Sequence, residues 1–304
     1  MVLLKQLCAM ENLCFEIKNS LGIKKMNEFF TQINGIKMCY SVQGEGYPLI
    51  LLHGFAMYKE FWNWQAEVLS KNFKLITLDF RGCGKSEHPK DEYSMEDLAE
   101  DVKALIDYLQ IENVNLGGHS FGGMVAQHFA LKYPEQLNKL LLMSTFANLP
   151  LSKSGLEMYK QSQLDFYDMK MKDPTSAFWN KMKQRFSREF YKEMRDNPSK
   201  IFTNGFKPLD LLEFEKNNGT SKPEDILNMI NAITHHNTLD RLKEIKNKTL
   251  ILAAEKDRVV SKLSCEIIYE KIPNSELMIF NGSHFFMLEE ATEVNEKILN
   301  FLKG

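Results

Sequence analysis

The sequence predicts an α/β fold in which a mostly parallel, eight-stranded sheet is flanked by helices. Short apolar runs bounded by turn residues recur along the chain, and helical patterns separate most of them. Such alternation is typical of a parallel sheet covered by helices on both faces. Between about Ala147 and His236 the pattern changes to helical periodicity and prolines without a buried strand, and this stretch is too long for a bare loop. We therefore expect a helical insertion within an α/β domain.

The composition is that of a globular protein and argues against several kinds of partner. The chain has 304 residues, of which 44% are hydrophobic and 26% charged, and its formal net charge is −2. Nucleic acids and anionic membranes are bound through clustered positive charge, so neither is expected as a partner. Five scattered cysteines without a C-x-x-C pair predict neither a disulfide framework nor a thiolate zinc site, and no apolar run reaches the roughly 20 residues of a membrane span. These features favour a cytoplasmic location and leave the oligomeric state open.

The first 27 residues are interpreted as an N-terminal extension. Their apolar residues would share one face if residues 2–21 formed a helix. Three interpretations are open for this segment: a fraying extension, a stretch read from an upstream start codon with the true start at Met26, or a docking helix. The core is expected in two parts, 28–146 and 237–304, with residues 147–236 between them as a helical lid.

Eight apolar runs are expected to form strands. The first two flank Asn34-Gly35, a pair that favours a tight hairpin turn, and the third is apolar throughout, as a strand buried on both faces would be. In chain order the runs are FFTQI, IKMCYSV, PLILLHG, FKLITLDF, VNLGGHS, LNKLLLMS, KTLILAAEKD and ELMIFNGSH. Helices are expected near 62–70, 94–110, 122–132, 262–271 and 289–302.

The clearest functional signal is the G-x-S-x-G motif Gly118-His119-Ser120-Phe121-Gly122, which joins an apolar strand to an amphipathic helix. A sharp turn in that setting lifts a serine hydroxyl toward a base and the positive end of the helix dipole. Glycines two residues to either side leave room where a Cβ would collide. The motif predicts a nucleophilic serine; the alternative is a capping serine in an ordinary glycine-rich turn.

Four further segments extend this pattern along the chain. They are His53-Gly54-Phe55-Ala56 after the third strand, the D-x-R-G-x-G-x-S turn from Asp79 to Ser86, Asp257 within AAEKDRVV, and His284 within NGSHFF. With these motifs the chain resembles the α/β-hydrolase superfamily over about residues 28–304, and its GHSFGG turn is similar to that of the serine carboxylesterase and enol-lactonase branch. The order Ser120, Asp257, His284 is the order in which that fold supplies its catalytic residues.

The resemblance implies a role for each of these residues. Ser120 would attack an acyl carbonyl, His284 would take its proton as general base, and Asp257 would hold the imidazole. The backbone N–H groups of Phe55 and Phe121 would form the oxyanion hole. Acyl chemistry is expected because dehalogenases and epoxide hydrolases of this superfamily carry an aspartate where this chain has a serine.

Other titratable residues near the motifs have competing interpretations. Glu255 could be the acid, but it would lie one step inward along the strand, before the loop. Asp79 is interpreted as part of a structural turn. Among the histidines, His119 is expected to point away from the nucleophile, and the pair His235-His236 lacks the carboxylate or cysteine spacing of a metal site. No metal and no cofactor is therefore expected.

Substrate selectivity is expected to reside in the insertion, which in this superfamily lies over the nucleophile as a lid. The predicted substrate contacts are His53, Gly54, Trp62, Phe178, Trp179 and Phe285. Aromatic residues of the lid either line an apolar pocket or only pack the lid onto the core. Residues 151–200 hold eleven Lys and Arg against seven Asp and Glu, an excess that either attracts an anionic acyl compound or belongs to a solvated helix face.

These features predict a serine hydrolase that cleaves a small carboxylic ester or lactone through an acyl-enzyme. Three alternatives stay open: a C–C bond hydrolase of a vinylogous diketone acid, a cofactor-free perhydrolase or haloperoxidase, and a receptor-like binder of a small molecule. Phosphate-binding functions are not expected, because no G-x-x-x-x-G-K-[ST] or G-x-G-x-x-G motif opens a helix after a strand.

Overall fold

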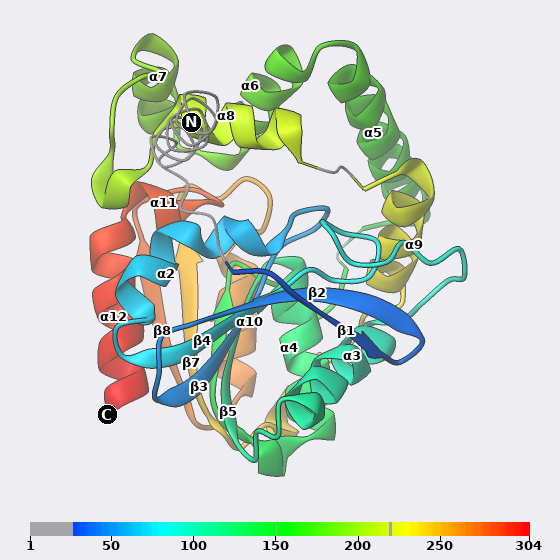
Figure 1. The fold of residues 1–304 in the computed structure, drawn as a ribbon, viewed down its shortest axis with the longest axis vertical. Coiled ribbons are helices and arrows are strands. Elements are labelled where there is room, and N and C mark those ends of the chain that lie inside the picture. Colours follow the sequence, from blue (N-terminus) through cyan, green and yellow to red (C-terminus); the bar gives the residue numbers. More distant parts are fainter. Residues whose placement is uncertain (1–26, 150, 219–220) are drawn as a thin grey trace, which may run out of the picture.

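The computed structural model describes residues 27–149, 151–218 and 221–304 of the chain. The expected helix over residues 2–21 and the alternative start at Met26 lie outside these residues. Figure 1 shows a central twisted sheet with helices on both faces and a further group of helices above one edge.

A single eight-stranded sheet forms the centre of the described part, in the order β1-β2-β4-β3-β5-β6-β7-β8. The pairs β1–β2 and β2–β4 are antiparallel, and the others are parallel, which confirms the predicted fold class. Asn34 and Gly35 both have positive φ, as the predicted tight hairpin turn requires. The strands are β1 Phe29–Ile33, β2 Ile36–Gln43, β3 Tyr47–Leu52, β4 Phe73–Leu78, β5 Val114–His119, β6 Leu137–Met143, β7 Lys248–Ala254 and β8 Ser275–Phe280.

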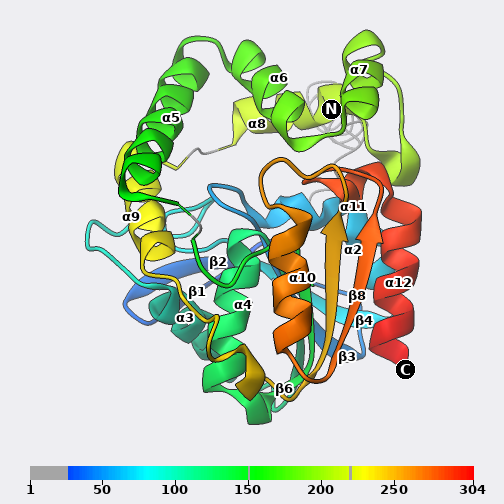
Figure 2. The same ribbon diagram turned by 180° about the vertical axis from the view of Figure 1, so that it is seen from behind.

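Helices cover both faces of the sheet. Helices α3 (Met95–Tyr108), α4 (Phe121–Lys132) and α10 (Lys262–Lys271) pack on one face, as Figure 2 shows for α4 and α10. The other face carries α2 (Asn63–Leu69), preceded by a 3₁₀ turn at Lys59–Trp62, and α12 (Ala291–Lys303), preceded by α11 (Phe286–Glu289). The five helices expected outside the insertion are thus present, with ends shifted by up to two residues.

Alternate residues of each central strand enter different cores, because successive side chains of a strand point to opposite faces. In β3, Ile50 and Leu52 pack with α3, α4 and α10, whereas Leu49 and Leu51 pack with α2 and α12. All four side chains are fully buried. The strand therefore needs the continuous apolar run that its sequence shows.

Between β6 and β7 the chain forms helices rather than strands, and these helices lie over the carboxyl edge of the sheet in Figures 1 and 2. Three prolines of this segment, Pro174, Pro208 and Pro223, occupy the first turn of a helix, where the missing N–H is harmless. The segment comprises α5 Lys153–Lys172, α6 Pro174–Arg185, α7 Arg188–Asp196, α8 Pro208–Asn217 and α9 Pro223–Thr234, with 3₁₀ turns at Thr203–Gly205 and Leu242–Glu244.

Helix α5 differs from the other helices of this segment because none of its side chains is buried. It packs against α6 and α9. Its ends are fixed locally, since the Ser152 hydroxyl accepts a hydrogen bond from the N–H of Gly155 at 3.2 Å and Asp173 caps the helix that follows.

The junction of β5 and α4 is held together by backbone at very close range. A Cβ added to Gly118 would lie 2.1 Å from the carbonyl oxygen of Gly122, and one added to Gly122 would lie 2.4 Å from that of Leu52. Real side chains do not approach backbone so closely. Both glycines are therefore required for α4 to begin directly over the ends of β3 and β5.

We predict that Gly118→Ala destabilises the protein by about 3 kcal/mol or more, because backbone atoms at this junction cannot yield to a new methyl group. The free energy of unfolding in urea measures the effect. The control is Gly155→Ala in α5, where the nearest atom to a new Cβ is 3.4 Å away. Alanine is favoured over glycine within a helix by about 1 kcal/mol, so this variant should be at least as stable as the parent. Equal stability of the two variants would contradict the close packing at Gly118.

Candidate active site

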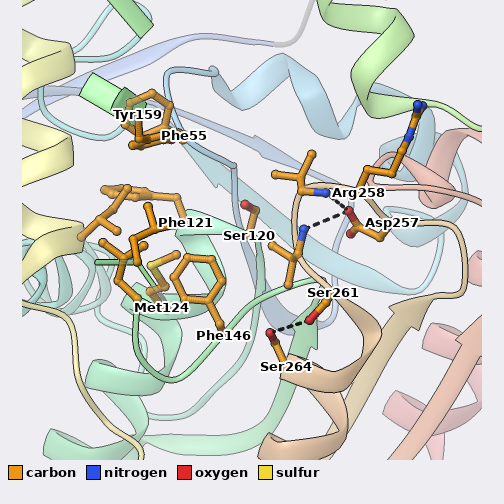
Figure 3. A pocket seen from close by; sticks show the side chains of 15 residues that line it. Phe55, Ser120, Phe121, Met124, Phe146, Tyr159, Asp257, Arg258, Ser261 and Ser264 are labelled. Atoms are coloured by element: carbon orange, nitrogen blue, oxygen red, sulfur yellow. Dashed lines mark hydrogen bonds between the residues drawn. The ribbon is translucent and has the colours of Figure 1, made fainter. Parts of the chain in front are cut away.

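Ser120 occupies the turn between β5 and α4 in a strained backbone conformation. Its φ is 53° and its ψ is −114°, values that L-residues adopt rarely. Three hydrogen bonds hold the turn: the N–H of Ser120 donates to Met143, and its carbonyl accepts from the N–H of Gly123 and from the hydroxyl of Thr145, at 2.8, 2.9 and 2.8 Å. The side chain is thereby directed away from the sheet, into the cavity drawn in Figure 3.

Asp257 and His284 form a buried pair at the ends of neighbouring strands. Asp257 follows β7, His284 follows β8, and the Asp257 carboxylate lies 2.8 Å from Nδ1 of the imidazole. The other carboxylate oxygen accepts the N–H groups of Val259 and Val260 at 2.8 and 3.0 Å. Because an ionised carboxylate only accepts, Nδ1 of His284 carries the proton and Nε2 is left with a lone pair.

The loop that carries His284 lies directly against the serine turn. Nε2 of His119, the residue before Ser120, donates to the carbonyl of His284 at 3.0 Å, and the two imidazole rings are 4.6 Å apart between centroids. Burial lowers the pKa of His119 well below its usual range, so it is neutral here. No hydrogen bond joins the hydroxyl of Ser120 to the ring of His284. Such contacts are often long in unliganded enzymes and tighten when substrate binds.

The electrostatics of the pair favour a neutral imidazole beside an ionised carboxylate. Burial is the largest influence on His284 and lowers its pKa, although Asp257 partly opposes this by attracting the imidazolium. For Asp257 burial acts to raise the pKa, but His284 and the two valine N–H groups outweigh it and lower the pKa to about 2. At neutral pH His284 can therefore accept a proton while Asp257 remains charged.

Two backbone N–H groups near Ser120 are free to bind a ligand oxygen. Phe121 is the first residue of α4, so its N–H has no partner within the helix. Neither this group nor the N–H of Phe55 donates to another residue of the described chain. The rings of Phe55 and Phe121 pack edge to face with centroids 6.2 Å apart, which brings the loop after β3 against the start of α4.

His53 shapes the loop after β3. Its Nε2 accepts the N–H of Phe80 at 3.2 Å, so the proton resides on Nδ1 and is donated to the carbonyl of Gly54 at 2.8 Å. Burial lowers its pKa to about 4. The neutral imidazole thus links the loop after β3 to the loop after β4 through hydrogen bonds. The side chain of His53 has no exposed surface.

A cavity of about 350 Å³ opens beside Ser120 and is shown in Figure 3. Its wall is largely apolar and includes the Asp257 segment. The lining residues are Phe55, Ser120, Phe121, Met124, Phe146, Leu149, Leu151, Tyr159, Ile233, Asp257, Arg258, Val259, Val260, Ser261 and Ser264. They come from loops at the carboxyl edge of the sheet and from α4, α5, α9 and α10.

The predicted substrate contacts differ from this lining. None of His53, Gly54, Trp62, Phe178, Trp179 and Phe285 lines the cavity beside Ser120 in the described part of the chain. Trp62, Phe178, Trp179 and Phe285 are buried instead in the core formed by α2, α12 and α6. Large aromatic side chains gain most free energy when they are fully buried, and here that is achieved in the core. For Phe178 and Trp179 of the lid, this position favours packing over a role in lining the cavity beside Ser120.

The wall residues that the sequence reasoning missed follow a simple pattern. Phe146 and Leu149 come directly after β6, and Val259 and Val260 directly after Asp257. Apolar residues just beyond the carboxyl ends of parallel strands are the available signal, because ligands bind at that edge of such sheets. Tyr159 is half-buried on helix α5, which has no fully buried side chain, and nothing in its local sequence distinguishes it.

Two competing carboxylates are engaged elsewhere. Glu255 is half exposed and pairs with Lys262 at 2.8 Å, so Asp257 is the acid that contacts His284. Asp79 is fully buried and accepts the backbone N–H groups of Lys59 and Lys85 at 2.7 and 3.0 Å. This is the structural turn expected from its motif.

The remaining histidines have protein partners. Nε2 of His128 and Nδ1 of His236 are 3.0 Å apart, and His236 also contacts the carbonyl of Phe146. His88 binds Asp225, and His235 contacts a carbonyl within α9. Within the described ranges no three His, Cys, Asp or Glu side chains are grouped so that they could hold a metal ion.

The end of α6 is fastened to the residues that follow both members of the acid–base pair. Arg258 donates to the carbonyls of Lys183 and Phe186 at 2.7 and 2.9 Å, and the N–H of Phe285 donates to the carbonyl of Arg185 at 3.0 Å.

The carboxylate of Glu289 adds a further link between the segment and this edge. It accepts the N–H groups of Ser187 and Ser283 at 2.8 and 3.2 Å. The helical segment and the His284 loop therefore form one hydrogen-bonded unit.

Comparisons with known proteins place the chain in a family. A family model for the alpha/beta hydrolase fold matches residues 47–291, and the chain belongs to this family. It is 30% identical over 263 residues to the AB hydrolase superfamily protein YisY of Bacillus subtilis, covering 85% of this chain and 92% of that protein. No described helix is both long and apolar enough to cross a membrane.

Solved structures with this fold include esterases and lactonases. The enol-lactonase from Burkholderia xenovorans LB400 superimposes with a TM-score of 0.76 at 21% identity, over 91% of this chain and all (100%) of that one. The esterase from Exiguobacterium antarcticum gives a TM-score of 0.73 at 25% identity, over 92% of this chain and 100% of that one. The chain is therefore a member of a hydrolase family whose structural neighbours include enzymes for esters and lactones.

We predict that the pKa of His284 lies below the usual value of about 6.5 and falls further in Asp257→Asn, because the carboxylate opposes the effect of burial. Titration of the imidazole signals by NMR, assigned with His284→Gln, measures both values. Since the unfolded state binds the proton more readily, His284 disfavours the folded state as the pH falls through and below 6.5. A pKa above 6.5, or an increase in Asp257→Asn, would contradict this electrostatic description.

Proposed function

We propose that the protein hydrolyses small carboxylic esters or lactones through an acyl-enzyme, with Ser120 as nucleophile, His284 as general base and Asp257 as the residue that orients it. One observation carries the proposal: the strained Ser120 turn faces an apolar cavity whose wall also holds the carboxylate paired with His284. This arrangement combines a presented hydroxyl, a neutral imidazole and a fixed counter-charge.

The first half of the reaction forms the acyl-enzyme. The hydroxyl oxygen of Ser120 attacks the acyl carbonyl while Nε2 of His284 takes the hydroxyl proton. The tetrahedral oxyanion accepts hydrogen bonds from the N–H groups of Phe55 and Phe121, which have no partner in the described chain. Collapse expels the alcohol, which takes the proton from His284. In a lactone the alcohol stays tethered to the acyl group.

The second half releases the acid. Water attacks the acyl carbonyl as His284 accepts one of its protons. The second tetrahedral species then collapses to the carboxylic acid, and the departing serine oxygen takes the proton back from His284, which restores the free hydroxyl. Asp257 stabilises the imidazolium in both halves without being protonated itself, in accord with the lowering of its pKa to about 2.

Residues 147–236 are proposed to act as the lid of the site. Leu149, Leu151, Tyr159 and Ile233 of this segment contribute to the cavity wall. A volume of about 350 Å³ lies near the lower end of the range for small-molecule sites. The cavity therefore favours short acyl and alcohol groups over long lipid chains.

The similarity to the Exiguobacterium antarcticum esterase, at 25% identity over 92% of this chain, supports ester cleavage. The enol-lactonase at 21% identity shares the fold and adds no argument about substrate. The other chemistries considered for the sequence would use the same serine and histidine, and no described feature favours one of them.

Labelling with a fluorophosphonate and turnover of p-nitrophenyl acetate, butyrate and octanoate test the proposal. Ser120→Ala should lose labelling and at least about 1,000-fold in kcat, because the nucleophile acts as a unit with its base. Ser154→Ala, an exposed serine of α5, should keep both. Butyrate should be preferred over octanoate, given the cavity volume. Labelling or full turnover in Ser120→Ala would refute the assignment, and tight ligand binding without any turnover would favour a receptor-like role.

A further inference from the structure

A second cavity, of about 130 Å³, adjoins the first between the helical segment and the loop after β3. Phe55 lines both cavities, so its side chain lies between them or along both. Its walls come from α5, α6, α8 and α9. In contrast to the apolar first cavity, its lining includes four charged side chains: Lys170, Lys181, Arg185 and Glu215.

Positively charged side chains outnumber negatively charged ones in the lining of this second cavity. Lys181 and Glu215 pair with each other at 2.8 Å, with side chains 16% and 6% exposed. Lys170 and Arg185 have no carboxylate within salt-bridge distance in the described part of the chain. Glu215 is already engaged by Lys181. It still attracts Lys170 over a longer distance, and Asp257 attracts Arg185 in the same way, but neither cation has a direct ion pair within the described residues.

An uncompensated cation in such a place is unfavourable unless a ligand neutralises it. Burial is the largest influence on both groups and lowers the pKa of Lys170 and of Arg185. The guanidinium of arginine nevertheless stays protonated in proteins. Its charge is therefore permanent, and an anion bound in the cavity would be stabilised by it.

Arg185 is fixed close to the proposed catalytic machinery. Its carbonyl accepts the N–H of Phe285, the residue after His284, at 3.0 Å. On the opposite side, the ring of Phe55 contacts Tyr159 of the first cavity with centroids 6.1 Å apart. A molecule whose carbonyl lies at Ser120 could thus pass Phe55 and place its far end at the cations.

We propose that the second cavity binds a carboxylate at the far end of the substrate, so that the enzyme prefers half-esters of dicarboxylic acids or lactones that bear a free carboxylate. This inference rests on the proposed function and narrows its substrate class. The planar guanidinium of Arg185 offers two parallel N–H donors to a carboxylate, and Lys170 adds a third donor. The nearby Glu215 disfavours a dianion such as a phosphate ester, whose second charge it would repel.

The proposal also accounts for a feature of the sequence that the catalytic residues leave unused. Lys170 and Arg185 belong to the stretch 151–200, where cations exceed anions by eleven to seven. For these two residues the structure favours a ligand-facing role over a solvated surface, because both line a cavity.

The kinetic test compares acids with their neutral methyl esters. Methyl hydrogen glutarate against dimethyl glutarate places the charge on the acyl side, and 4-acetoxybutyrate against its methyl ester places it on the alcohol side. The wild-type enzyme should prefer the acid in at least one pair by about tenfold or more in kcat/KM, the effect expected of charge-assisted hydrogen bonds. A preference for the neutral ester in both pairs overturns the proposal.

The variants locate the effect. Arg185→Gln should reduce the ratio of acid to neutral-ester kcat/KM about tenfold or more, and Lys170→Gln should reduce it less, because arginine supplies two of the donors. Arg188→Gln is the matched control, since Arg188 is exposed, lies three residues away and has the same charge. Its ratio should stay at the wild-type value. An unchanged ratio in both cavity variants, or an equal loss in Arg188→Gln, overturns the proposal.

A binding measurement separates this inference from the proposed function. Calorimetry with glutarate on Ser120→Ala needs no turnover, and binding should weaken about tenfold in Ser120→Ala/Arg185→Gln. Loss of that difference refutes the carboxylate site even if esters are hydrolysed, whereas its presence supports the site even if Ser120 proves not to be the nucleophile. Inorganic phosphate is the competing probe, and binding as tight as that of glutarate would overturn the choice of a carboxylate.

Discussion

The close approach of β5 and α4 is the constraint on which the rest of the site depends. Gly118 and Gly122 allow backbone to touch backbone at this junction, and Ser120 between them has no relaxed conformation available. The strain is maintained because hydrogen bonds to the ends of the neighbouring strands fix the turn. The side chain at position 120 is consequently presented above the sheet, where loops after β3, β7 and β8 bring the other functional groups.

Much of this architecture is predictable from sequence, because local signals and the global fold agree. The apolar runs from Phe29 to Phe280 specify the strands, and the glycines around Ser120 specify the turn. The resemblance to the α/β-hydrolase superfamily also implies that Asp257 pairs with His284, and the two side chains lie 2.8 Å apart. These features depend on periodicity and on steric exclusion, both of which are properties of short segments.

Contacts with a ligand could not be predicted in the same way. Trp62, Phe178, Trp179 and Phe285 are aromatic and close in sequence to functional motifs, yet they fill the core, while Phe146 and Tyr159 form the cavity wall. Whether an aromatic ring is buried in a core or faces a cavity depends on how separate helices pack, which no short segment encodes. That Lys170 and Arg185 lack a direct ion pair among the described residues is likewise a property of the assembled helices α5, α6 and α8.

The uneven attachment of the helical segment determines how molecules can enter and leave. Its two connections to the sheet are joined to each other, since the N–H of Thr238 donates to Ala147 at 2.7 Å and Asn148 pairs with Asn237. The end of α6 is tied to the loops that carry Asp257 and His284, whereas α5 has no buried side chain and contributes Tyr159 to one cavity and Lys170 to the other. Helix α5 is therefore the wall element held by the least side-chain burial, the kind of element from which mobile lids are drawn. Its outward displacement would open one shared entrance to both cavities and leave Ser120, His284 and the N–H groups of Phe55 and Phe121 undisturbed.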